Sequence, residues 1–456
     1  MQTKGIVIAG LAGGSGKSVV SVGLTAYLAA RGKNVVPFKK GPDYIDAGWM
    51  ALAAGRDCYN LDPYLMSDEA ILTSFHTHCR GADMVVVEGN RGLYDGVDAQ
   101  GGYSTAELAL FLDLPVILVV NCTKTTRTVA ALVLGCKMLD RRLDIRGVIL
   151  NHVATARQRK IITAAVEEST GIPVLGVVPR MKKDIFPMRH LGMIPHQEYL
   201  GSGEAISHLA DVCAESVDTA AVEEAMKVIV PAPAPPPENA GGTRVRIGVI
   251  QDAAFQFYYP ENLAALKRQG AELVPVNALA DPHLPPLDGL YIGGGFPETS
   301  ARELAANATF RNSVKESADG GLPVYAECGG LIYLGESIRI EGEVYPLVGV
   351  FPVRFGMSTK PQAHGYSIFE VDSDTPYYAR GEEVRGHEFR YSTILEWNGK
   401  EDELAFTMKR GKGFSGGRDG LQSGNVLALY THVHACGTPD WAGRFVELCR
   451  RWRHRD

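Results

Sequence analysis

Short apolar runs alternate with longer stretches of helical periodicity through the first half of the chain. The runs are rich in β-branched residues, and most are followed by a segment long enough to form a crossover helix. This alternation predicts βαβ units and a mainly parallel sheet. The predicted strands cover residues 5–9, 35–38, 84–87, 116–120, 148–150 and 174–178.

The same rhythm restarts in the second half of the chain. Strands are predicted over residues 245–250, 272–276, 289–292 and 323–326, with a helix over 262–269.

Residues 230–243 separate the halves and read VPAPAPPPENAGGT, a composition typical of a stiff, extended linker. A chain of 456 residues is also too long for one ordinary core. We therefore expect an α/β fold of two domains, 1–229 and 244–456, joined by this linker.

Composition and charge narrow the class of function. The net charge is −6 and the Lys and Arg residues are scattered, so we expect no nucleic-acid partner and no membrane surface. Neither a signal peptide nor an apolar run of membrane-spanning length is evident. The eight cysteines are widely spaced, without a CxxC pair. These features favour a cytoplasmic enzyme of small-molecule chemistry.

A glycine-rich turn joins the first predicted strand to a helical stretch and reads GLAGGSGKS over residues 10–18. It fits the GGxGK[ST] variant of the phosphate loop, in which backbone amides at a helix N-terminus cradle phosphates. Lys17 is expected to reach the terminal phosphates of ATP, and the Ser18 hydroxyl to hold Mg²⁺. The glycines of the expected cradle are Gly13, Gly14 and Gly16.

Acidic residues follow the next two predicted strands. Asp43 and Asp46 lie in the sequence KKGPDYID, where they could take metal and substrate separately or belong to a solvated turn. Glu88 follows the third strand, and a carboxylate at the carboxyl end of a parallel strand points into the ligand crevice of the sheet. Because Mg²⁺ on phosphate oxygens needs acidic ligands, Glu88 is a candidate second metal ligand.

A phosphate loop also occurs in partitioning ATPases, which are switches rather than biosynthetic enzymes. Those proteins carry a signature lysine just before the double glycine, where this chain has Ala12. That alternative also leaves the second half of the chain unexplained.

The second half carries a candidate nucleophile at Cys328. A predicted strand leads into ECGG and then a helical stretch, the pattern of a nucleophile elbow that presents a thiol at a helix N-terminus. Gly294 and Gly295 follow another strand, and their amides are candidates for an oxyanion hole. His432 is the candidate base, with His434 as its neighbour or orienter. Because no HPE-type third residue is evident, the sequence predicts a Cys–His dyad.

Seven motifs in order resemble the family of cobyrinic acid a,c-diamide synthases and their hydrogenobyrinic acid and sirohydrochlorin-type relatives. They are KKGPDYID (39–46), NLDP (60–63), VEGNRGLYDG (87–96), STAE (104–107), RHLG (189–192), AECGG (326–330) and RGHEF (385–389). The resemblance implies a dethiobiotin-synthetase-like ATP domain followed by a class I glutamine amidotransferase-like domain. It also favours His432 as the residue that activates Cys328.

The resemblance also implies roles for individual residues of the first half. Ser18, Asp43 and Glu88 correspond to Mg²⁺ ligands. Lys17 and Lys39 correspond to phosphate contacts, and Asn151 and Pro179 to the edge of the adenine pocket. Tyr44, Asp46, Leu93 and Asp95 correspond to residues that face the tetrapyrrole.

The implied reaction is amidation of the a and c acetates of cobyrinic acid, with ATP and L-glutamine as co-substrates, through an acyl phosphate. Hydrogenobyrinic acid, sirohaem and Ni-sirohydrochlorin stay open as acceptors, because the enzymes that amidate them share the same ATP and glutamine motifs. Ala47 and Met50 depart from the family pattern beside the expected substrate wall. A homodimer also stays open.

Overall fold

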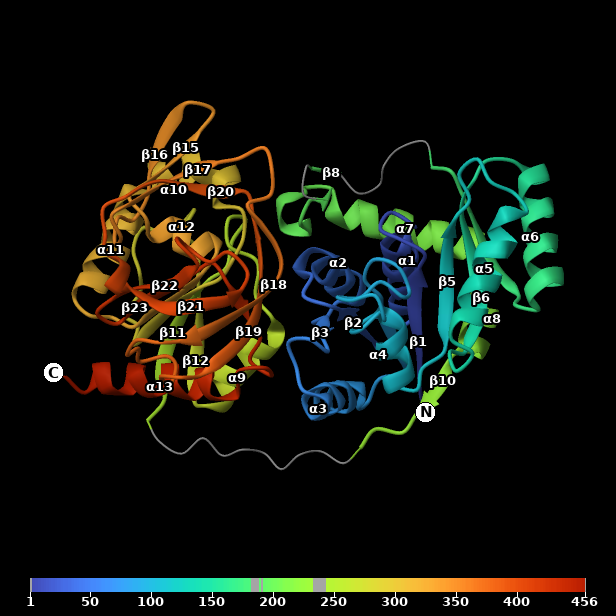
Figure 1. Cartoon of the computed structure of the whole chain (residues 1–456), viewed down its shortest axis with the longest axis horizontal. Coiled ribbons are helices and arrows are strands. Elements are labelled where there is room, and N and C mark those ends of the chain that lie inside the picture. The colour runs from blue at the N-terminus through green and yellow to red at the C-terminus, as the bar shows by residue number, and fades with distance from the viewer. Residues whose placement is uncertain (1, 182–187, 190–191, 233–242, 456) are drawn as a thin grey trace. The chain divides into compact units, whose positions relative to one another are not determined.

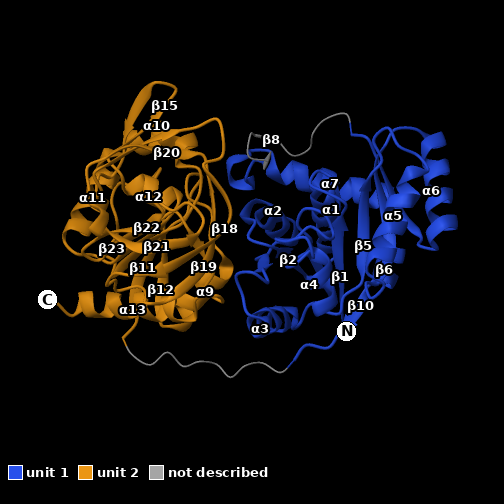
Figure 2. Ribbon diagram, viewed as in Figure 1, with its two compact units in different colours: residues 1–235 blue, residues 236–456 orange. Residues whose placement is uncertain are grey.

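The computed structural model describes residues 2–181, 188–189, 192–232 and 243–455. The chain forms two compact units, residues 1–235 and 236–456 (Figure 2). The division falls within the predicted linker, of which residues 233–242 lie outside the described part of the chain.

Unit 1 is built on an eight-stranded sheet in the order β3-β2-β4-β1-β5-β6-β7, with β10 paired to β1. Only β10 is antiparallel to its neighbour. The six predicted strands are confirmed, whereas β3 and β10, three residues each, are too short to show a pattern. The strands are β1 Thr3–Gly10, β2 Val35–Lys40, β3 Tyr59–Leu61, β4 Met84–Glu88, β5 Val116–Asn121, β6 Ile145–Val153, β7 Val174–Pro179 and β10 Lys227–Ile229.

Helices cover both faces of this sheet, and its central strands are buried along almost their whole length (Figure 1). The helices are α1 Lys17–Ala30, α2 Tyr44–Ala54, α3 Asp68–Cys79, α4 Thr105–Phe111, α5 Thr128–Leu139, α6 Ala156–Thr170, α7 Ser202–Ser216 and α8 Thr219–Ala225. Strand order reverses beside β1, which places a ligand crevice at the carboxyl ends of β1 and β4.

A small hairpin of β8 (Met188–Arg189) and β9 (Gly192–Met193) follows β7 and leads to the short helix η1 (His196–Glu198). It contains the RHLG motif, of which residues 190 and 191 lie outside the described residues.

Unit 2 is built on a ten-stranded sheet in the order β12-β11-β13-β14-β23-β22-β21-β18-β19-β24. Its first five strands run parallel and the others pair antiparallel. The predicted strands are confirmed as β11 Val245–Ile250, β12 Ala271–Val276, β13 Gly289–Ile292 and β14 Val324–Glu327. Neither β23 Val426–Leu429, the fifth parallel strand, nor the antiparallel extension was predicted. The extension consists of β18 Ala363–Val371, β19 Glu383–Arg390, β21 Leu404–Arg410, β22 Arg418–Ser423 and β24 His432–Val433.

A second sheet of unit 2 has the order β16-β15-β17-β20. Its strands are β15 Ser337–Ile340, β16 Glu343–Pro346, β17 Val353–Met357 and β20 Ser392–Trp397. The helices are α9 Pro260–Arg268, which confirms the predicted helix, α10 Ala301–Ala306, α11 Ala308–Asp319, α12 Gly329–Leu334 and α13 Pro439–Arg453, with η2 Pro297–Ser300 and η3 Glu401–Glu403.

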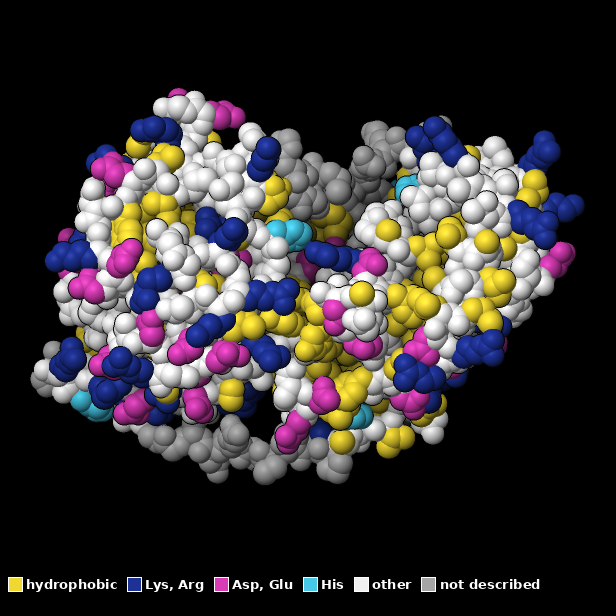
Figure 3. All heavy atoms as spheres, in the orientation of Figure 1, with side chains coloured by type: hydrophobic (Ala, Val, Ile, Leu, Met, Phe, Trp, Pro, Cys, Tyr) yellow, Lys and Arg dark blue, Asp and Glu magenta, His cyan; other side chains and the backbone are white. Residues whose placement is uncertain are grey.

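The surface shows no large patch of one charge on the face drawn in Figure 3, where basic and acidic side chains are mixed. No helix within the described ranges is both long enough and apolar enough to cross a bilayer.

Candidate active sites

The phosphate loop of unit 1 is held in shape by a buried amide from β6. Gly16 has a φ of 93°, and a Cβ built on it would lie 1.9 Å from Asn151 Nδ2. Asn151 Nδ2 donates to the Ser15 carbonyl at 3.0 Å. Only glycine therefore fits at position 16, and Asn151 lies directly against the loop.

Lys17, at the first position of α1, bridges two loops. Its ammonium donates to the carbonyl oxygens of Ala12 at 3.2 Å and Arg91 at 2.7 Å. Burial and the neighbouring Lys39 lower the pKa of Lys17. The lysine thus joins the phosphate loop to the loop that follows β4, where phosphate oxygens would compete for it.

Four side chains, one each from α1, β2, α2 and β4, form a hydrogen-bonded cluster beside the phosphate loop. Ser18 Oγ lies 2.9 Å from Glu88 Oε1 and 3.3 Å from Asp46 Oδ1. Lys39 Nζ lies 2.5 Å from Asp46 Oδ2, 3.1 Å from Glu88 Oε1 and 3.1 Å from the Gly89 carbonyl. Lys39 and Glu88 are register partners on adjacent strands β2 and β4, which explains why their side chains meet.

Burial and the neighbouring charges shift the pKa values of the ionisable groups in this cluster. Burial alone would lower the pKa of Lys39, but the carboxylates of Asp46 and Glu88 outweigh it and raise that pKa. Burial raises the pKa of Glu88 to about 7, with Lys39 opposing the shift. Burial and the nearby Asp46 raise the pKa of Asp43 to about 6. The cluster therefore carries more acidic groups than Lys39 alone neutralises.

Lys39 and Asp46 contact each other in the structure. The three acceptors of the Lys39 ammonium are the carboxylates of Asp46 and Glu88 and the Gly89 carbonyl, so the lysine pairs with the acids of the cluster. Asp46 lies with Ser18 and Glu88, among the expected metal-side residues, although the resemblance implied a substrate contact.

Asp43 caps the helix that carries Tyr44 and Asp46. Its Oδ1 accepts from the backbone N–H groups of Ile45 at 2.8 Å and Asp46 at 2.9 Å. The buried Asn60, of the NLDP motif, donates to the carbonyls of Gly41 and Asp43 at 2.8 and 3.1 Å and holds the turn in place. We did not assign Asn60 from the sequence, although its motif was a signal. Tyr44 is half-buried at the start of α2.

Two residues assigned to the substrate wall are buried in the core. Leu93 is 1% exposed, and its N–H donates to the Gly10 carbonyl. Met50 is fully buried inside α2, against Thr25, so this departure from the family pattern affects packing and does not line a surface.

Three other predicted positions lie near the surface or at a helix start. Asp95 is exposed, with one oxygen accepting from the Gly92 N–H. Pro179 is exposed at the end of β7. The buried Ala47 belongs to the first turn of α2.

The donor set fits Mg²⁺ bound together with phosphate. Glu88 Oε2 is buried and has no hydrogen-bond partner among the described residues, so one carboxylate oxygen is left for a cation. In that same part of the chain, no three His, Cys, Asp or Glu side chains form a ready-made metal site. Mg²⁺ commonly uses one or two carboxylates and completes its shell with phosphates and water. This cluster supplies the first part of such a shell.

In unit 2 the chain makes a strained turn at Cys328. The residue lies between β14 and α12 with φ 47° and ψ −95°, a left-handed φ that is rare outside glycine. Its N–H donates to the Leu429 carbonyl at 2.8 Å, which fixes the turn. The thiol lies at the N-terminus of a helix of only six residues, as the predicted elbow requires.

The glycines of the AECGG motif are required by close packing. A Cβ on Gly330 would lie 2.5 Å from the Ile292 carbonyl oxygen, and one on Gly329 would lie 3.0 Å from the Gly295 nitrogen. These contacts hold the elbow against the loop after β13. The structure therefore brings together Cys328 and the predicted oxyanion-hole loop.

Gly294 and Gly295 lie beside His432 and the turn at Cys328. A Cβ on Gly294 would lie 2.3 Å from His432 Cε1, and one on Gly295 would lie 2.0 Å from the Ala254 carbonyl oxygen. The Gly294 carbonyl accepts from Gln256 and Phe257 and orients the loop.

His432 is buried between two acidic or nucleophilic groups. Its Nδ1 lies 3.3 Å from Glu327 Oε2. Burial opposes the charged imidazolium, but the Cys328 thiol and the Glu327 carboxyl raise the pKa of His432 to about 10. His387, its register partner on β19, stacks on the ring at 4.9 Å.

The sequence predicts a Cys–His dyad, and in the structure a third side chain, that of Glu327, contacts His432. Glu327 was missed because we looked for an acid after the histidine, and this one precedes the cysteine. His434 is not the orienter: its Nδ1 accepts from the Cys436 N–H, and its Nε2 lies 3.7 Å from Glu261 Oε2.

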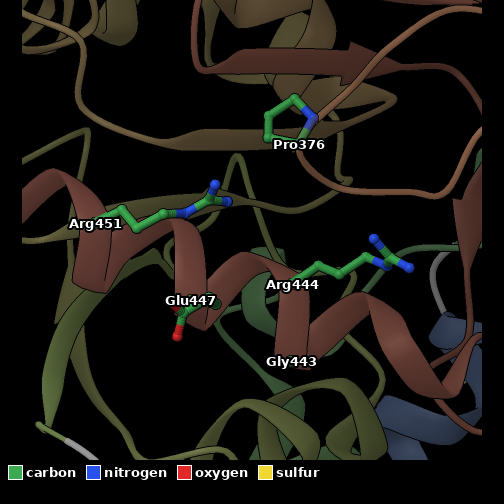
Figure 4. A pocket seen from close by; sticks show the side chains of 5 residues that line it. All are labelled: Pro376, Gly443, Arg444, Glu447 and Arg451. Atoms are coloured by element: carbon green, nitrogen blue, oxygen red, sulfur yellow. The ribbon is translucent and has the colours of Figure 1, made fainter.

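A surface hollow of about 420 Å³ lies over α13 and is separate from both sets of predicted residues (Figure 4). Two of its lining residues are basic and one is acidic. It is lined by Pro376, Gly443, Arg444, Glu447 and Arg451.

Known proteins are similar to this chain in both of its halves. Residues 6–191 match the CobQ/CobB/MinD/ParA nucleotide binding domain, and residues 246–439 match the CobB/CobQ-like glutamine amidotransferase domain. A cobyrinate a,c-diamide synthase of Magnetococcus marinus is 41% identical over 97% of this chain and 95% of its own. One of Archaeoglobus fulgidus is 42% identical over 98% of each chain. This chain therefore belongs to the family of cobyrinate a,c-diamide synthases.

Proposed function

We propose that this chain converts the a and c acetate carboxylates of cobyrinic acid into amides, with ATP for activation and glutamine as nitrogen source. The observation that carries the proposal is the presence in one chain of two different sites. One combines a phosphate loop with an acidic cluster, and the other combines a strained cysteine with a buried histidine.

Unit 1 activates the carboxylate. A carboxylate oxygen of the substrate attacks the γ-phosphorus of ATP, an O–P bond forms, and the bond to the bridging oxygen breaks to release ADP. Lys17 and the amides around Gly13, Gly14 and Gly16 hold the phosphates, and Asn151 and Pro179 border the adenine. The product is an acyl phosphate.

Mg²⁺ would be held by Ser18 and Glu88, with Asp43 and Asp46 beside them, and it would supply charge neutralisation for the phosphate oxygens. Lys39 keeps Glu88 and Asp46 in place by pairing with both carboxylates. Tyr44 and Asp95 are the proposed contacts to the macrocycle.

Unit 2 supplies ammonia. The Cys328 thiolate attacks the side-chain carbonyl of glutamine, while Gly294 and Gly295 donate hydrogen bonds to the developing oxyanion. The C–N bond breaks as His432 gives a proton to the leaving nitrogen, and ammonia departs. Water then hydrolyses the glutamyl thioester, with His432 as base, to release glutamate.

Ammonia then attacks the acyl phosphate. A C–N bond forms, the C–O bond to phosphate breaks, and the attacking nitrogen loses a proton. Each amide therefore consumes one ATP and one glutamine and yields ADP, phosphate and glutamate.

The test uses purified chain with ATP, Mg²⁺ and glutamine against cobyrinic acid, hydrogenobyrinic acid, sirohaem and Ni-sirohydrochlorin. Product mass and ADP release are measured together. We expect double amidation of cobyrinic acid. Amidation of one of the other three in its place would keep the reaction and replace the acceptor, whereas absence of both ADP and glutamate would contradict the proposal.

A further inference from the structure

A buried carboxylate directly precedes the nucleophile and has no role in the reaction described above. Glu327 is the last residue of β14 and is fully buried. Burying an ionisable acid is costly unless it has a partner. The partner that faces it is the His432 imidazole, from a strand more than a hundred residues later in the chain.

The carboxylate holds the histidine by two separate contacts. Glu327 Oε2 lies 3.3 Å from His432 Nδ1, and Oε1 accepts from the N–H of the next residue, Val433, at 3.5 Å. One contact orients the ring and the other holds the backbone of β24. With Nδ1 directed at a carboxylate, Nε2 is the ring nitrogen left for Cys328.

The fold explains why these side chains meet. β14 pairs with β23, with Glu327 beside Leu429, and the chain runs from Leu429 through two residues to His432. β24 then pairs with β19 at the far edge of the sheet. Glu327 and Cys328 thus lie at the end of β14. His432 lies just after β23, the strand that pairs with β14.

We propose that Glu327 is the positioning residue of the glutaminase site, so that Cys328, His432 and Glu327 form a triad whose acid comes from the residue before the nucleophile. This inference rests on the proposed glutaminase function of unit 2. The acid fixes the imidazole with Nε2 toward the thiol and stabilises the imidazolium that accompanies the thiolate. Glu327 itself neither gains nor loses a proton in the cycle.

The other buried acid–histidine pair nearby does not meet the same requirements. Glu261 lies 3.7 Å from His434, whose other ring nitrogen accepts from a backbone N–H. His387 stacks on His432, and burial lowers its pKa well below the usual value, so it is neutral and adds no countercharge.

The titratable groups around the pair come from several elements. Those that interact with His432 or with Glu327 are Cys328, His387, Tyr258, Tyr291, Tyr325 and Tyr378.

The test compares Glu327→Gln with the matched control Glu261→Gln, both in the full chain. The glutamine variant keeps the size of the side chain and removes its charge. We expect kcat for glutamine hydrolysis to fall about 10²- to 10⁴-fold in Glu327→Gln, with KM little changed, and less than about tenfold in Glu261→Gln. Amidation supported by free ammonia should stay at the wild-type rate in both variants. Glu327→Asp should recover part of the lost rate.

A second readout separates positioning from a purely structural effect. The rate at which iodoacetamide alkylates Cys328 is followed against pH by peptide mass spectrometry. Loss of the acid should move the half-maximal rate to higher pH, because the imidazolium that favours the thiolate is weakened. A Glu327→Gln variant with the wild-type profile would overturn the inference, even if its glutaminase rate fell. If the wild type hydrolyses no glutamine, the proposed function of unit 2 fails, and the alkylation profile still decides the role of Glu327.

Discussion

The two candidate active sites handle buried charge in opposite ways. In unit 1, Asp43, Asp46 and Glu88 gather around one lysine, and the pKa values of Asp43 and Glu88 are raised to about 6 and about 7. In unit 2, one glutamate faces one histidine, and each has a hydrogen-bonded partner. The acids of the first site outnumber the lysine that pairs with them, whereas the acid of the second site is paired with a histidine.

The sharpest way to separate the sites is to remove the thiol. Cys328→Ser should lower glutamine-dependent amidation at least about 10³-fold, because a serine hydroxyl is a far weaker nucleophile than a thiolate. Ammonia-dependent amidation should persist, since unit 1 is unchanged. Both rates are measured by product mass at matched nitrogen concentrations. Equal loss of the two rates would show that the sites do not divide the chemistry as described.

The reciprocal change is Lys17→Ala in the phosphate loop. It should lower the rate of amidation about 10²- to 10³-fold with either nitrogen source, because the positive charge that stabilises the transferred phosphate is removed. Glutamine hydrolysis, measured as glutamate release without acceptor, should change little. Lys33→Ala, a half-buried lysine three residues after the end of α1, is the control. A Lys17 variant that amidates at the wild-type rate would contradict the assignment of the loop.

The elbow of unit 2 can be tested through its packing. Gly330→Ala places a Cβ 2.5 Å from a backbone carbonyl and should lower the free energy of unfolding of unit 2 by about 1–3 kcal/mol. Gly443→Ala, in α13, meets only ordinary contacts at 3.7 Å and should raise it by up to about 1 kcal/mol. Urea unfolding followed by tryptophan fluorescence measures both. Equal effects would show that the elbow tolerates a side chain.

Unit 2 also contains a buried acid outside its candidate active site, Asp419. Burial and Glu388 raise its pKa to about 7, although it accepts from the N–H groups of Tyr430 and Thr431. The folded chain then holds a proton that the unfolded chain releases above about pH 4. Its stabilising contribution is therefore complete below that pH and is lost as the pH rises to 7.

Asp419→Asn removes this titration. Between pH 5 and pH 8 the wild type should lose about 1–2 kcal/mol more of its free energy of unfolding than the variant. Urea unfolding at both pH values supplies the comparison. Equal changes in the two proteins would exclude a raised pKa for this carboxyl.

Much of this contrast could be predicted from the sequence, because the motifs lie at strand ends. The alternation of strands and helices predicted a parallel sheet in each half. The GGxGK[ST] motif predicted the phosphate loop, and ECGG predicted the turn at Cys328. The antiparallel extension of unit 2 was not predicted. Glu327 was not identified because its contact with His432 arises from the pairing of β14 with β23, two strands that lie far apart in the sequence. The sequence did not predict the ion pair between Lys39 and Asp46. Which charged side chains meet depends on the register of the strands, and a sequence pattern does not give that register.

The central claim is that one chain couples ATP-dependent activation to nitrogen released from glutamine. The most direct test incubates the wild-type protein with cobyrinic acid, ATP, Mg²⁺ and glutamine labelled in its amide nitrogen, and follows product mass and ADP. The account predicts a product with two labelled amides and one ADP per amide. An unlabelled amide would contradict it, as would cobyrinic acid left unchanged when hydrogenobyrinic acid, sirohaem and Ni-sirohydrochlorin are left unchanged as well.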